Sequence, residues 1–344
     1  MINVLHCIGI PVKGGLERIV INLIQDDKST INQISYYILS VGGNANEIGA
    51  FYNNIKIDFF LRFKNLFRIF SFLKERDFSI IHCHTLKSYC IFLILRFFFK
   101  YKLIFHFHSY AVFDYRYFSF ATLLLKKADY RICVNDDLKN ILNSKYGILC
   151  EVVYNGIDDR AIERLSQTIK PFQEDFIKLG YVGRLEVEKY VLDLAQIFNS
   201  IYQETKADSI VVFGSGSLKN KLITELNSKK ILFEIIENED KVEKIYSTFD
   251  LLLVPSKKET FSLVSLEALL AHRIVITRDI ISYHIFKDLF PEQIYFLNDY
   301  LEAPKDFSKL SSGIISYNVD RVMKYFSVTA QKEKIEDIYI SLLM

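Results

Sequence analysis

The sequence predicts an α/β protein with two doubly wound domains, each built on a parallel sheet with helices on both faces. Its 344 residues suit two domains better than one. Short β-branched runs alternate with helical patterns along the whole chain, which is typical of parallel sheets with crossover helices. The alternation restarts after the turn dipeptide Asn155-Gly156, which marks a boundary between two halves.

Strand candidates follow one another at short intervals in both halves. They lie at residues 2–8, 34–41, 79–82, 102–107, 130–134 and 151–154, and then at residues 177–182, 209–213, 231–236, 250–254 and 273–277. The stretches between them carry apolar residues mostly three or four apart, such as Val191, Leu194, Ala195, Phe198 and Ile201. Doubly wound sheets bind ligands at the carboxyl ends of their strands, so the following loops are where chemistry is expected.

The composition argues against several classes of protein. Half of the residues are apolar, 24% are charged and the net charge is +2, which disfavours a general nucleic-acid binder. Five cysteines without a C-x-x-C pair favour free thiols in a reducing compartment over disulfides or a zinc framework. The first residues show no signal peptide, and the apolar stretch 89–107 is interrupted by Arg96, Lys100 and Lys102. We therefore expect a cytoplasmic protein.

Positive charge and phenylalanine are concentrated in the first half. Residues 56–131 hold 14 Lys or Arg against 5 Asp or Glu, and 16 of the 29 Phe. Within this stretch, residues 61–76 form a basic amphipathic helix pattern whose apolar stripe is Phe63, Leu66, Phe67, Phe70 and Leu73. Such a helix suits the anionic inner face of a cytoplasmic membrane. The alternative is a helix packed on its own sheet.

Three glycine-rich loops follow predicted strands. Gly14-Gly15 precedes a helical pattern, and Gly183 and Gly214 open the loops after residues 177–182 and 209–213. Glycines let the backbone approach a ligand closely and leave helix N–H groups free for an anion. Each loop is also compatible with an ordinary tight turn.

Two cations flank the second of these loops. Arg184 and Lys189 lie close to a helix N-terminus, where positive charge is unfavourable unless an anion compensates it. A phosphate would be such an anion. The alternative is that Lys189 pairs with Glu186 or Glu188 in solvent.

Two glutamates follow the strand candidate at residues 250–254. A helix is expected to begin near Ser262, with Thr260 or Ser262 as its cap, and its apolar stripe of Leu263, Leu266 and Leu270 includes Glu267. A carboxylate that faces a core needs a cation or hydroxyl donors, and a ribose diol supplies two hydroxyls. A structural salt bridge is the alternative. Glu259 lies in the preceding loop, where a polar ligand would also meet free helix N–H groups.

Four histidines lie at the ends of two predicted strands, His82 with His84 and His106 with His108. An H-x-H pattern presents both imidazoles on one face of a strand, as in zinc sites, but no Cys or acidic residue has the spacing to complete a ligand set. Their position at strand ends favours imidazoles that orient a sugar or stabilise its leaving phosphate. For at least two of the four, a purely structural role is the alternative.

In this order, the motifs resemble those of the retaining GT-B glycosyltransferases of family 4, which assemble bacterial surface polysaccharides such as capsule or O-antigen. The resemblance covers nearly the whole chain with matching order and spacing. It rests on Gly14-Gly15-Leu16-Glu17, the histidine-bearing segments 80–84 and 104–108, segment 128–134, Asn155-Gly156-Ile157-Asp158, Val182-Gly183-Arg184-Leu185 with Lys189, the Glu259 and Glu267 pair with seven residues between them, and the final helix at 335–343.

The resemblance implies two Rossmann-like domains that face each other across a cleft. An acceptor domain would comprise residues 1–158 and a returning helix at 330–344, and a donor domain would comprise residues 159–329. The activity implied is metal-independent transfer of a hexosyl group from a nucleotide-diphosphate sugar, a UDP-sugar, to a lipid-linked glycan. No cofactor and no metal are expected.

The resemblance also implies roles for individual residues. Arg184 and Lys189 would neutralise the diphosphate, Glu267 would bind the ribose, and Glu259 would hold the transferred sugar. One of His106 and His108, with His108 favoured, would lie by the anomeric centre. The remaining donor-binding positions implied are Gly14, Gly15, Gly183, Gly214, Thr260, Phe261 and Ser262. The acidic pairs Asp136-Asp137 and Asp158-Asp159 are interpreted as a helix cap and a turn, not as metal ligands.

The chain departs from the family pattern at three places. His272-Arg273-Ile274 stands where the family has Gly-x-Pro, residues 279–282 replace a Gly-Gly turn, and Thr260 and Ser262 replace glycines. These departures support a second hypothesis, a catalytically inactive GT-B partner subunit of an active enzyme. A third hypothesis is a nucleotide-sugar epimerase, which shares the architecture but needs acid and base carboxylates that the sequence does not place.

Overall fold

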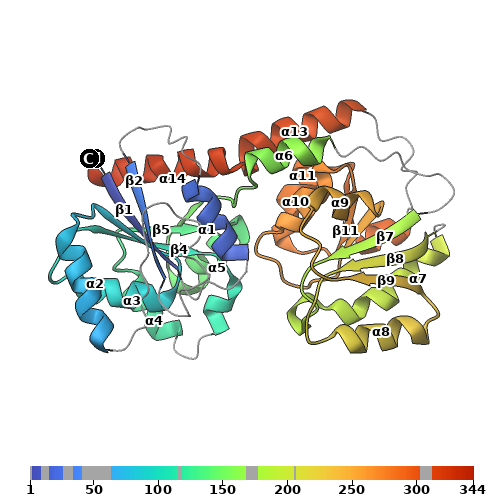
Figure 1. Cartoon of the computed structure of the whole chain (residues 1–344), viewed down its shortest axis with the longest axis horizontal. Coiled ribbons are helices and arrows are strands. Elements are labelled where there is room, and N and C mark those ends of the chain that lie inside the picture. The colour runs from blue at the N-terminus through green and yellow to red at the C-terminus, as the bar shows by residue number, and fades with distance from the viewer. Residues whose placement is uncertain are drawn as a thin grey trace. The chain divides into compact units, whose positions relative to one another are not determined.

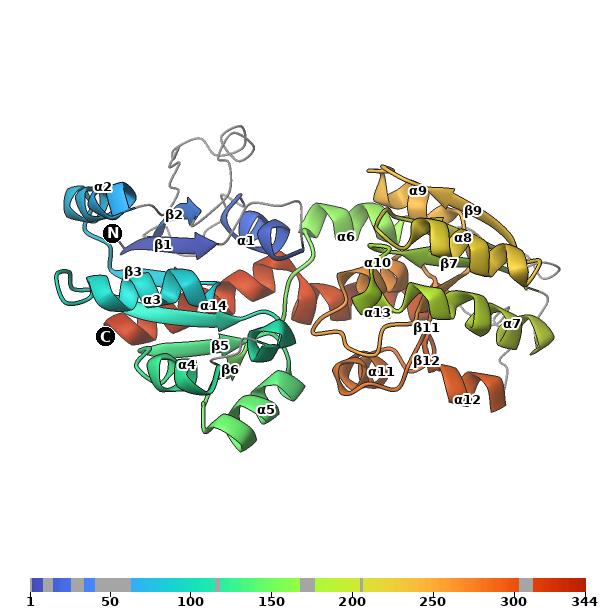
Figure 2. The same cartoon turned by 90° about the horizontal axis from the view of Figure 1, so that it is seen from below.

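The computed structural model describes residues 2–8, 15–25, 34–40, 63–114, 118–167, 177–204, 207–302 and 312–344. The chain divides into two compact units, which are Met1–Gly156 with Val328–Met344, and Ile157–Ser327. The predicted limits at residues 158 and 330 lie two residues further along the chain. Each unit is a parallel sheet with helices on both faces (Figures 1 and 2), as the sequence predicts.

The first unit contains a six-stranded sheet in the order β2-β1-β3-β4-β5-β6. Every neighbouring pair is parallel. The order changes direction between β1 and β3, which makes the sheet doubly wound. The strands are β1 (Ile2–Ile8), β2 (Ile34–Ser40), β3 (Ile80–Cys83), β4 (Lys102–Phe107), β5 (Tyr130–Cys133) and β6 (Glu151–Val152).

Short polar side chains begin several helices of this unit. Thr85 caps α3 by accepting a hydrogen bond from the Ser88 backbone N–H, and Asn135 caps α5 in the same way. Asp136 and Asp137 were expected to be the cap, but they occupy the first turn of α5. The helices are α1 (Gly15–Gln25), α2 (Phe63–Glu75), α3 (Leu86–Leu95), α4 (Phe118–Leu125), α5 (Asp136–Tyr146) and α14 (Val328–Leu343).

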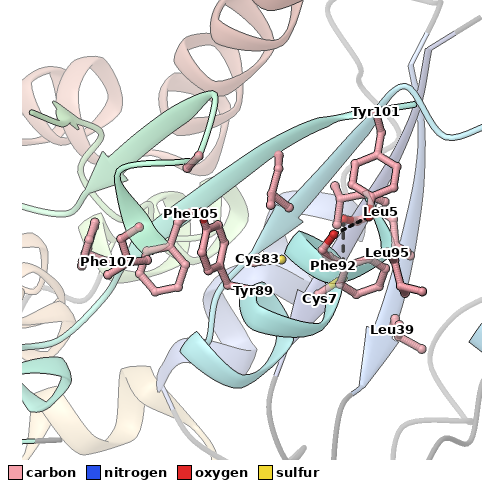
Figure 3. Close-up of a cluster of buried hydrophobic side chains, with 14 of the residues drawn as sticks. Leu5, Cys7, Leu39, Cys83, Tyr89, Phe92, Leu95, Tyr101, Phe105 and Phe107 are labelled. Atoms are coloured by element: carbon pink, nitrogen blue, oxygen red, sulfur yellow. Dashed lines mark hydrogen bonds between the residues drawn. The ribbon is translucent and has the colours of Figure 1, made fainter. Parts of the chain in front are cut away.

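Alternate residues of the first sheet face two different layers of helices. One face is covered by α2, α3, α4 and α5, and Figure 3 shows Tyr89 of α3 there beside Phe105, and Phe92 beside Tyr101. The other face is covered by α1 and α14. Four strand residues pack there against Ile335, Ile338 and Tyr339 of α14, namely Val4, Ile80, Ile104 and Ile132. His6, His82 and His106 lie two residues beyond Val4, Ile80 and Ile104, so they share this second face.

The second unit also contains a six-stranded sheet, in the order β12-β11-β10-β7-β8-β9. All neighbouring strands are parallel, and the order changes direction between β7 and β10. The strands are β7 (Ile177–Val182), β8 (Ala207–Phe213), β9 (Leu232–Ile236), β10 (Leu251–Val254), β11 (Ile274–Thr277) and β12 (Ile294–Phe296). The strand β12 was not predicted, because its three residues are too few to show a pattern.

Two sets of helices cover this sheet. The helices α7 (Leu194–Glu204) and α8 (Lys219–Ser228) pack on one face, where the predicted stripe from Val191 to Ile201 is buried as expected. The remaining helices are α6 (Asp159–Ser166), α9 (Val242–Ser247), α10 (Leu263–Leu270), α11 (His284–Leu289), α12 (Leu297–Glu302) and α13 (Ser312–Phe326). Asp158 caps α6 by accepting from the Ala161 N–H, so this acidic pair begins a helix and not a turn.

A helix that crosses a bilayer must be both long and apolar. Among the described residues, no helix meets both requirements for crossing a membrane. The apolar stretch 89–107 divides into the end of α3, a turn and the buried strand β4.

Candidate functional site

The predicted donor residues of the second unit meet at one edge of its sheet. Gly183 follows β7, Gly214 follows β8, and the segment from Pro255 to Ser262 follows β10. The strands β10, β7 and β8 are adjacent, so these three loops begin side by side at their carboxyl ends. The direction of the strand order changes between β10 and β7, and ligands of doubly wound sheets bind at such a point.

The first two loops are in direct backbone contact. The Gly183 N–H donates to the Phe213 carbonyl over 2.9 Å, and the Leu185 N–H donates to the Ser215 carbonyl over 2.8 Å. A Cβ atom on Gly214 would lie 1.9 Å from the Gly183 carbonyl oxygen, and one on Gly216 would lie 2.4 Å from that of Leu185. The glycines are therefore required for the packing of the loops, whatever ligand the loops bind.

Replacement of Gly214 by alanine is expected to destabilise the protein. The added methyl group must displace the Gly183 carbonyl, and overpacking of this kind costs about 1–3 kcal/mol. We expect the Tm to fall by several degrees in a thermal melt. Ser215→Ala is the matched control, because the neighbouring Ser215 side chain is exposed and should be replaceable without loss. Equal melting temperatures for the two variants would contradict the role assigned to Gly214.

Lys189 forms an ion pair with Glu259 of the neighbouring loop. Its Nζ lies 2.7 Å from the Glu259 Oε1, with side-chain exposures of 28% and 12%. The alternative pairings with Glu186 or Glu188 are therefore wrong. Glu188 pairs with Arg184 at 2.9 Å on the surface, and Glu186 accepts from the backbone and hydroxyl of Ser217. The sequence placed Lys189 and Glu259 in one site, and the structure brings these two side chains together.

Glu267 is buried in α10. Its side chain faces inward with 6% exposure, and its Oε2 accepts a hydrogen bond of 2.8 Å from the Tyr246 hydroxyl. Tyr246 itself is fully buried in α9. The prediction of a single apolar stripe on α10 is wrong, because all residues from Ser265 to Leu270 are buried. A carboxylate in a fully enclosed helix still needs hydrogen-bond donors, and the Tyr246 hydroxyl is one of them.

The residues between the two glutamates fix the start of α10. Ser262 is the cap, as expected, and its hydroxyl accepts from the Ser265 N–H. Ser265 continues the network to the Tyr283 hydroxyl at 2.7 Å. The Phe261 ring packs between Phe286 and Phe326 at 5.4 and 5.7 Å. Thr260, beside Glu259, is half-buried, so this segment is held by a cap on one side and aromatic packing on the other.

Two further side chains at this edge of the sheet, Arg278 and Tyr190, were not predicted from the sequence. Arg278 follows β11, donates to the Pro255 carbonyl over 2.8 Å and pairs with Asp193 at 2.5 Å. Its position directly after a predicted strand was the available signal. Tyr190, next to Lys189, has a φ of 52°, an uncommon conformation for a non-glycine residue. Lys257 lies over its ring at 4.7 Å.

The departure from the family pattern at residues 272–274 lies away from this edge. Arg273 precedes β11 at its amino end, opposite the carboxyl ends that carry Glu259 and Lys189. Its guanidinium is fully buried, 3.7 Å from Asp250 at the start of β10. This difference therefore concerns the far side of the sheet, not the donor loops.

In the first unit, the predicted histidines form one buried cluster. The His106 and His108 rings stack at 3.9 Å, His82 and His84 at 4.4 Å, and His84 hydrogen-bonds His108 over 2.8 Å. The cluster also contains His6 of β1, which sequence reasoning missed because a single histidine in a strand carries no pattern. Burial lowers the pKa of all five imidazoles, and that of His6 and His108 to about 3.

Only one glycine of the loop predicted after the first strand lies within the described residues. Gly14 lies outside the described residues, and Gly15 is the first residue of α1. The helix therefore begins one residue before Leu16, where the sequence predicts its start.

Two glycosyltransferase families match the chain, one in each unit. Residues 13–161 match Glycosyltransferase Family 4, and residues 177–316 match Glycosyl transferases group 1. An uncharacterized glycosyltransferase of Methanocaldococcus jannaschii is 30% identical over 133 residues, which are 35% of this chain and 34% of that protein. The match thus spans about a third of the length of this curated relative.

Two solved structures share the fold over almost the whole chain. HepE of Anabaena in complex with UDP has a TM-score of 0.72 at 13% identity and covers 99% of this chain and 100% of its own. The lipopolysaccharide outer core galactosyltransferase WaaB, in its apo form, has a TM-score of 0.71 at 19% identity and covers 98% and 99%. The two family matches fall on two Rossmann-like units, and they identify the chain as a glycosyltransferase with the GT-B fold.

Proposed function

We propose that this protein transfers a hexosyl group from a UDP-sugar to a growing, lipid-linked surface glycan, with retention of anomeric configuration. The Lys189–Glu259 pair carries the proposal, because a cation and a carboxylate lie together at the strand-order reversal of the second sheet, where ligands of doubly wound sheets bind. HepE was solved with UDP, which supports that nucleotide. WaaB acts on lipopolysaccharide, which supports a surface glycan such as capsule or O-antigen as the acceptor.

In the proposed reaction, the bond between the anomeric carbon and the leaving phosphate oxygen breaks as the acceptor hydroxyl bonds to the same face of the sugar. The acceptor proton goes to the leaving phosphate. Negative charge develops on the diphosphate, and Lys189 and Arg184 stabilise it in the role that a metal ion fills in other transferases. Glu259 holds hydroxyls of the sugar, Glu267 holds the ribose, and His108 lies beside the anomeric centre.

One incubation separates this proposal from its two rivals. The purified protein is mixed with a panel of nucleotide sugars, with and without a lipid-linked acceptor. Transfer, or slow donor hydrolysis without acceptor, identifies a glycosyltransferase. An isomerised donor would identify an epimerase. No change in any donor would favour the inactive partner subunit. The presence of Lys189, Glu259 and Glu267 argues against that hypothesis.

We also propose that the first unit binds an anionic membrane surface, through a patch that differs from the predicted one. Ile69 and Leu73 of α2 are buried against the sheet, so that helix directs apolar residues inward, and the side chains of Phe63, Leu66 and Phe67 lie outside the description. Exposed apolar residues gather instead on three helices, namely Phe70 on α2, Ile94, Phe97 and Phe98 at the end of α3, and Phe120 and Leu123 on α4.

These exposed residues lie on three helices, α2, α3 and α4, that contact one another. The rings of Phe70 and Phe98 contact each other at 5.7 Å, and the Tyr89 hydroxyl of α3 donates to the Leu124 carbonyl of α4. Exposed cations also lie on these helices or in the turns that follow them, namely Lys74, Arg76, Lys87, Lys100, Lys126 and Lys127. Exposed phenylalanine beside lysine is the combination that binds to an anionic lipid interface.

The membrane proposal predicts that the protein sediments with anionic liposomes at low salt. Phe97 and Phe98 are 88% and 67% exposed, and their joint replacement by aspartate should reduce binding at least tenfold. The reason is that each buried phenylalanine contributes about 1.5–3 kcal/mol. The control is Leu149→Asp, at a residue that is 69% exposed but lies outside the patch. Equal binding by both variants, or no binding by the wild type, would refute the patch.

A further inference from the structure

Two of the five cysteines form a close pair at one side of the first sheet. The Sγ atoms of Cys133 and Cys150 lie 3.1 Å apart, and both residues are free thiols. Cys133 is the last residue of β5, and Cys150 directly precedes β6, the neighbouring strand. Because a disulfide bond is about 2.0 Å long, the two sulfurs need to approach by only about 1 Å to form one. These two residues are here called the thiol pair.

The two members of the thiol pair differ in exposure. Cys133 is fully buried, and its thiol can donate to the backbone carbonyls of Glu151 and Asn135, which lie 3.5 and 3.6 Å from the sulfur. Cys150 is only half-buried. A small oxidant in solvent can therefore reach Cys150 first, and Cys133 only through Cys150.

Cations lie beside the more exposed member. The Arg131 Nε donates to the Leu149 carbonyl over 2.9 Å, which holds this guanidinium next to Cys150. The hydrogen bond between the two sulfurs, aided by the charges of Lys139 and Arg131, lowers the pKa of Cys150 despite its partial burial. The same hydrogen bond, together with burial, raises the pKa of Cys133. Because the thiolate is the nucleophilic form, Cys150 is the sulfur that attacks and Cys133 is the one that keeps its proton.

The other three cysteines lack this combination of features. Cys7 and Cys83 lie opposite each other on β1 and β3, but both are fully buried, so a solvent oxidant reaches neither of them. Cys90 of α3 is half-buried, and burial raises its pKa. The thiol pair is therefore the place where an accessible, ionisable sulfur has a second sulfur within reach.

We propose that Cys150 is a site of reversible oxidation by hydroperoxides and that it forms a disulfide with Cys133. The Cys150 thiolate attacks one peroxide oxygen: an S–O bond forms, the O–O bond breaks, and the other oxygen leaves and takes up the proton that Cys150 lost on ionising. Cys133 then attacks the sulfenic sulfur, so the S–S bond forms, the S–O bond breaks, and hydroxide leaves as water with the Cys133 proton. The two sulfurs give two electrons to the peroxide, and a dithiol returns them.

The disulfide would close the segment that contains α5 into a covalent loop. The helix α5, Asp136–Tyr146, lies between the two cysteines, directly after the carboxyl end of β5. A closed loop restricts the unfolded chain, so the oxidised protein should have a Tm several degrees higher than the reduced protein. In a reducing compartment the thiol pair rests as two thiols, and the loop closes only under oxidation.

The test uses the whole protein, which is reduced, freed of reductant and exposed to hydrogen peroxide before the remaining thiols are alkylated under denaturing conditions. Trypsin cleaves after Lys139 and Lys145, so it separates the two cysteines of the thiol pair. We expect mass spectrometry to detect a linked pair of peptides joined through Cys133 and Cys150, which a dithiol separates. In the reduced protein at neutral pH, Cys150 should react with iodoacetamide about tenfold or more faster than Cys90, because a larger fraction of it is thiolate.

Two variants separate the thiol pair from general oxidation. In Cys133→Ser, peroxide should leave Cys150 as a sulfenic acid that dimedone traps, and the Tm should no longer rise. The matched control is Cys90→Ser, which removes a half-buried thiol outside the pair and should form the disulfide as the wild type does. A wild type without the linked peptides, a link that forms only in denatured protein, or oxidation of Cys90 before Cys150 would overturn the proposal. The wild type alone gives these three results, even where a variant does not fold.

Discussion

Replacing Lys189 by alanine is expected to reduce kcat/KM on the order of a hundredfold or more, by analogy with the removal of one donor that stabilises a developing anion. The variant loses the cation nearest Glu259 at the strand-order reversal of the second sheet. Arg184→Ala should have an effect of the same order, because a guanidinium can hold two phosphate oxygens at once. Stability should change little, since partly exposed ion pairs contribute about 0–1 kcal/mol.

The matched control for Arg184 is Arg164→Ala. Arg164 forms a surface ion pair with Glu243 at 3.1 Å, much as Arg184 does with Glu188, but the two residues belong to α6 and α9 and not to the donor loops. Steady-state kinetics and thermal melts of Lys189→Ala, Arg184→Ala and Arg164→Ala separate an effect on activity from an effect on stability. Near-normal turnover in Arg184→Ala or Lys189→Ala, or an equal loss in Arg164→Ala, would show that the cations do not act on the diphosphate.

Glu267→Gln is expected to weaken the binding of UDP by about tenfold to a hundredfold while the fold remains intact. Hydrogen bonds to a charged group contribute about 1.5–3 kcal/mol, and the amide keeps the shape but loses the charge that would hold two ribose hydroxyls. The amide oxygen can still accept from the Tyr246 hydroxyl, so the packing of α10 against α9 should survive. Calorimetry with UDP gives the affinity, and a melting curve gives the stability.

A purely structural role of Glu267 predicts the opposite pattern. The Tm would then fall and the affinity of the folded protein for UDP would not change. Glu225→Gln serves as the control, because Glu225 is an exposed residue of α8 and should affect neither quantity. An unchanged dissociation constant in Glu267→Gln would refute the ribose assignment.

The alternation of strands and helices was predictable from the sequence because each element has a long or strongly periodic signal. The stripe from Val191 to Ile201 has helical spacing, and it is buried in the structure. Shorter signals failed: β12 has three residues, and Asp158-Asp159 as a turn was wrong because Asp158 starts a helix. Sequence position alone does not distinguish a polar residue that caps a helix from one that makes a turn.

The residues of the candidate site could be predicted from the sequence, but the contacts between their side chains could not. Strand-end loops place Lys189 and Glu259 at one edge, yet only the strand order reveals that β7 and β10 are neighbours and that the two side chains meet. His6 and Tyr339 are more than 300 residues apart, so no local pattern could join them. For the helix at residues 61–76 the sequence left two alternatives open, because periodicity shows that a helix has an apolar face but not whether the sheet already covers it. In the structure Ile69 and Leu73 are buried and Phe70 is exposed.

The central claim is that this protein cleaves a nucleotide-diphosphate sugar with cationic side chains at the donor loops. The most direct test is a panel of nucleotide sugars incubated in excess EDTA, with released nucleoside diphosphate as the measured product. The account predicts donor-dependent release by the wild type, greatest with a UDP-sugar, and a loss on the order of a hundredfold in Lys189→Ala. Abolition of release by EDTA with recovery on adding manganese would contradict it.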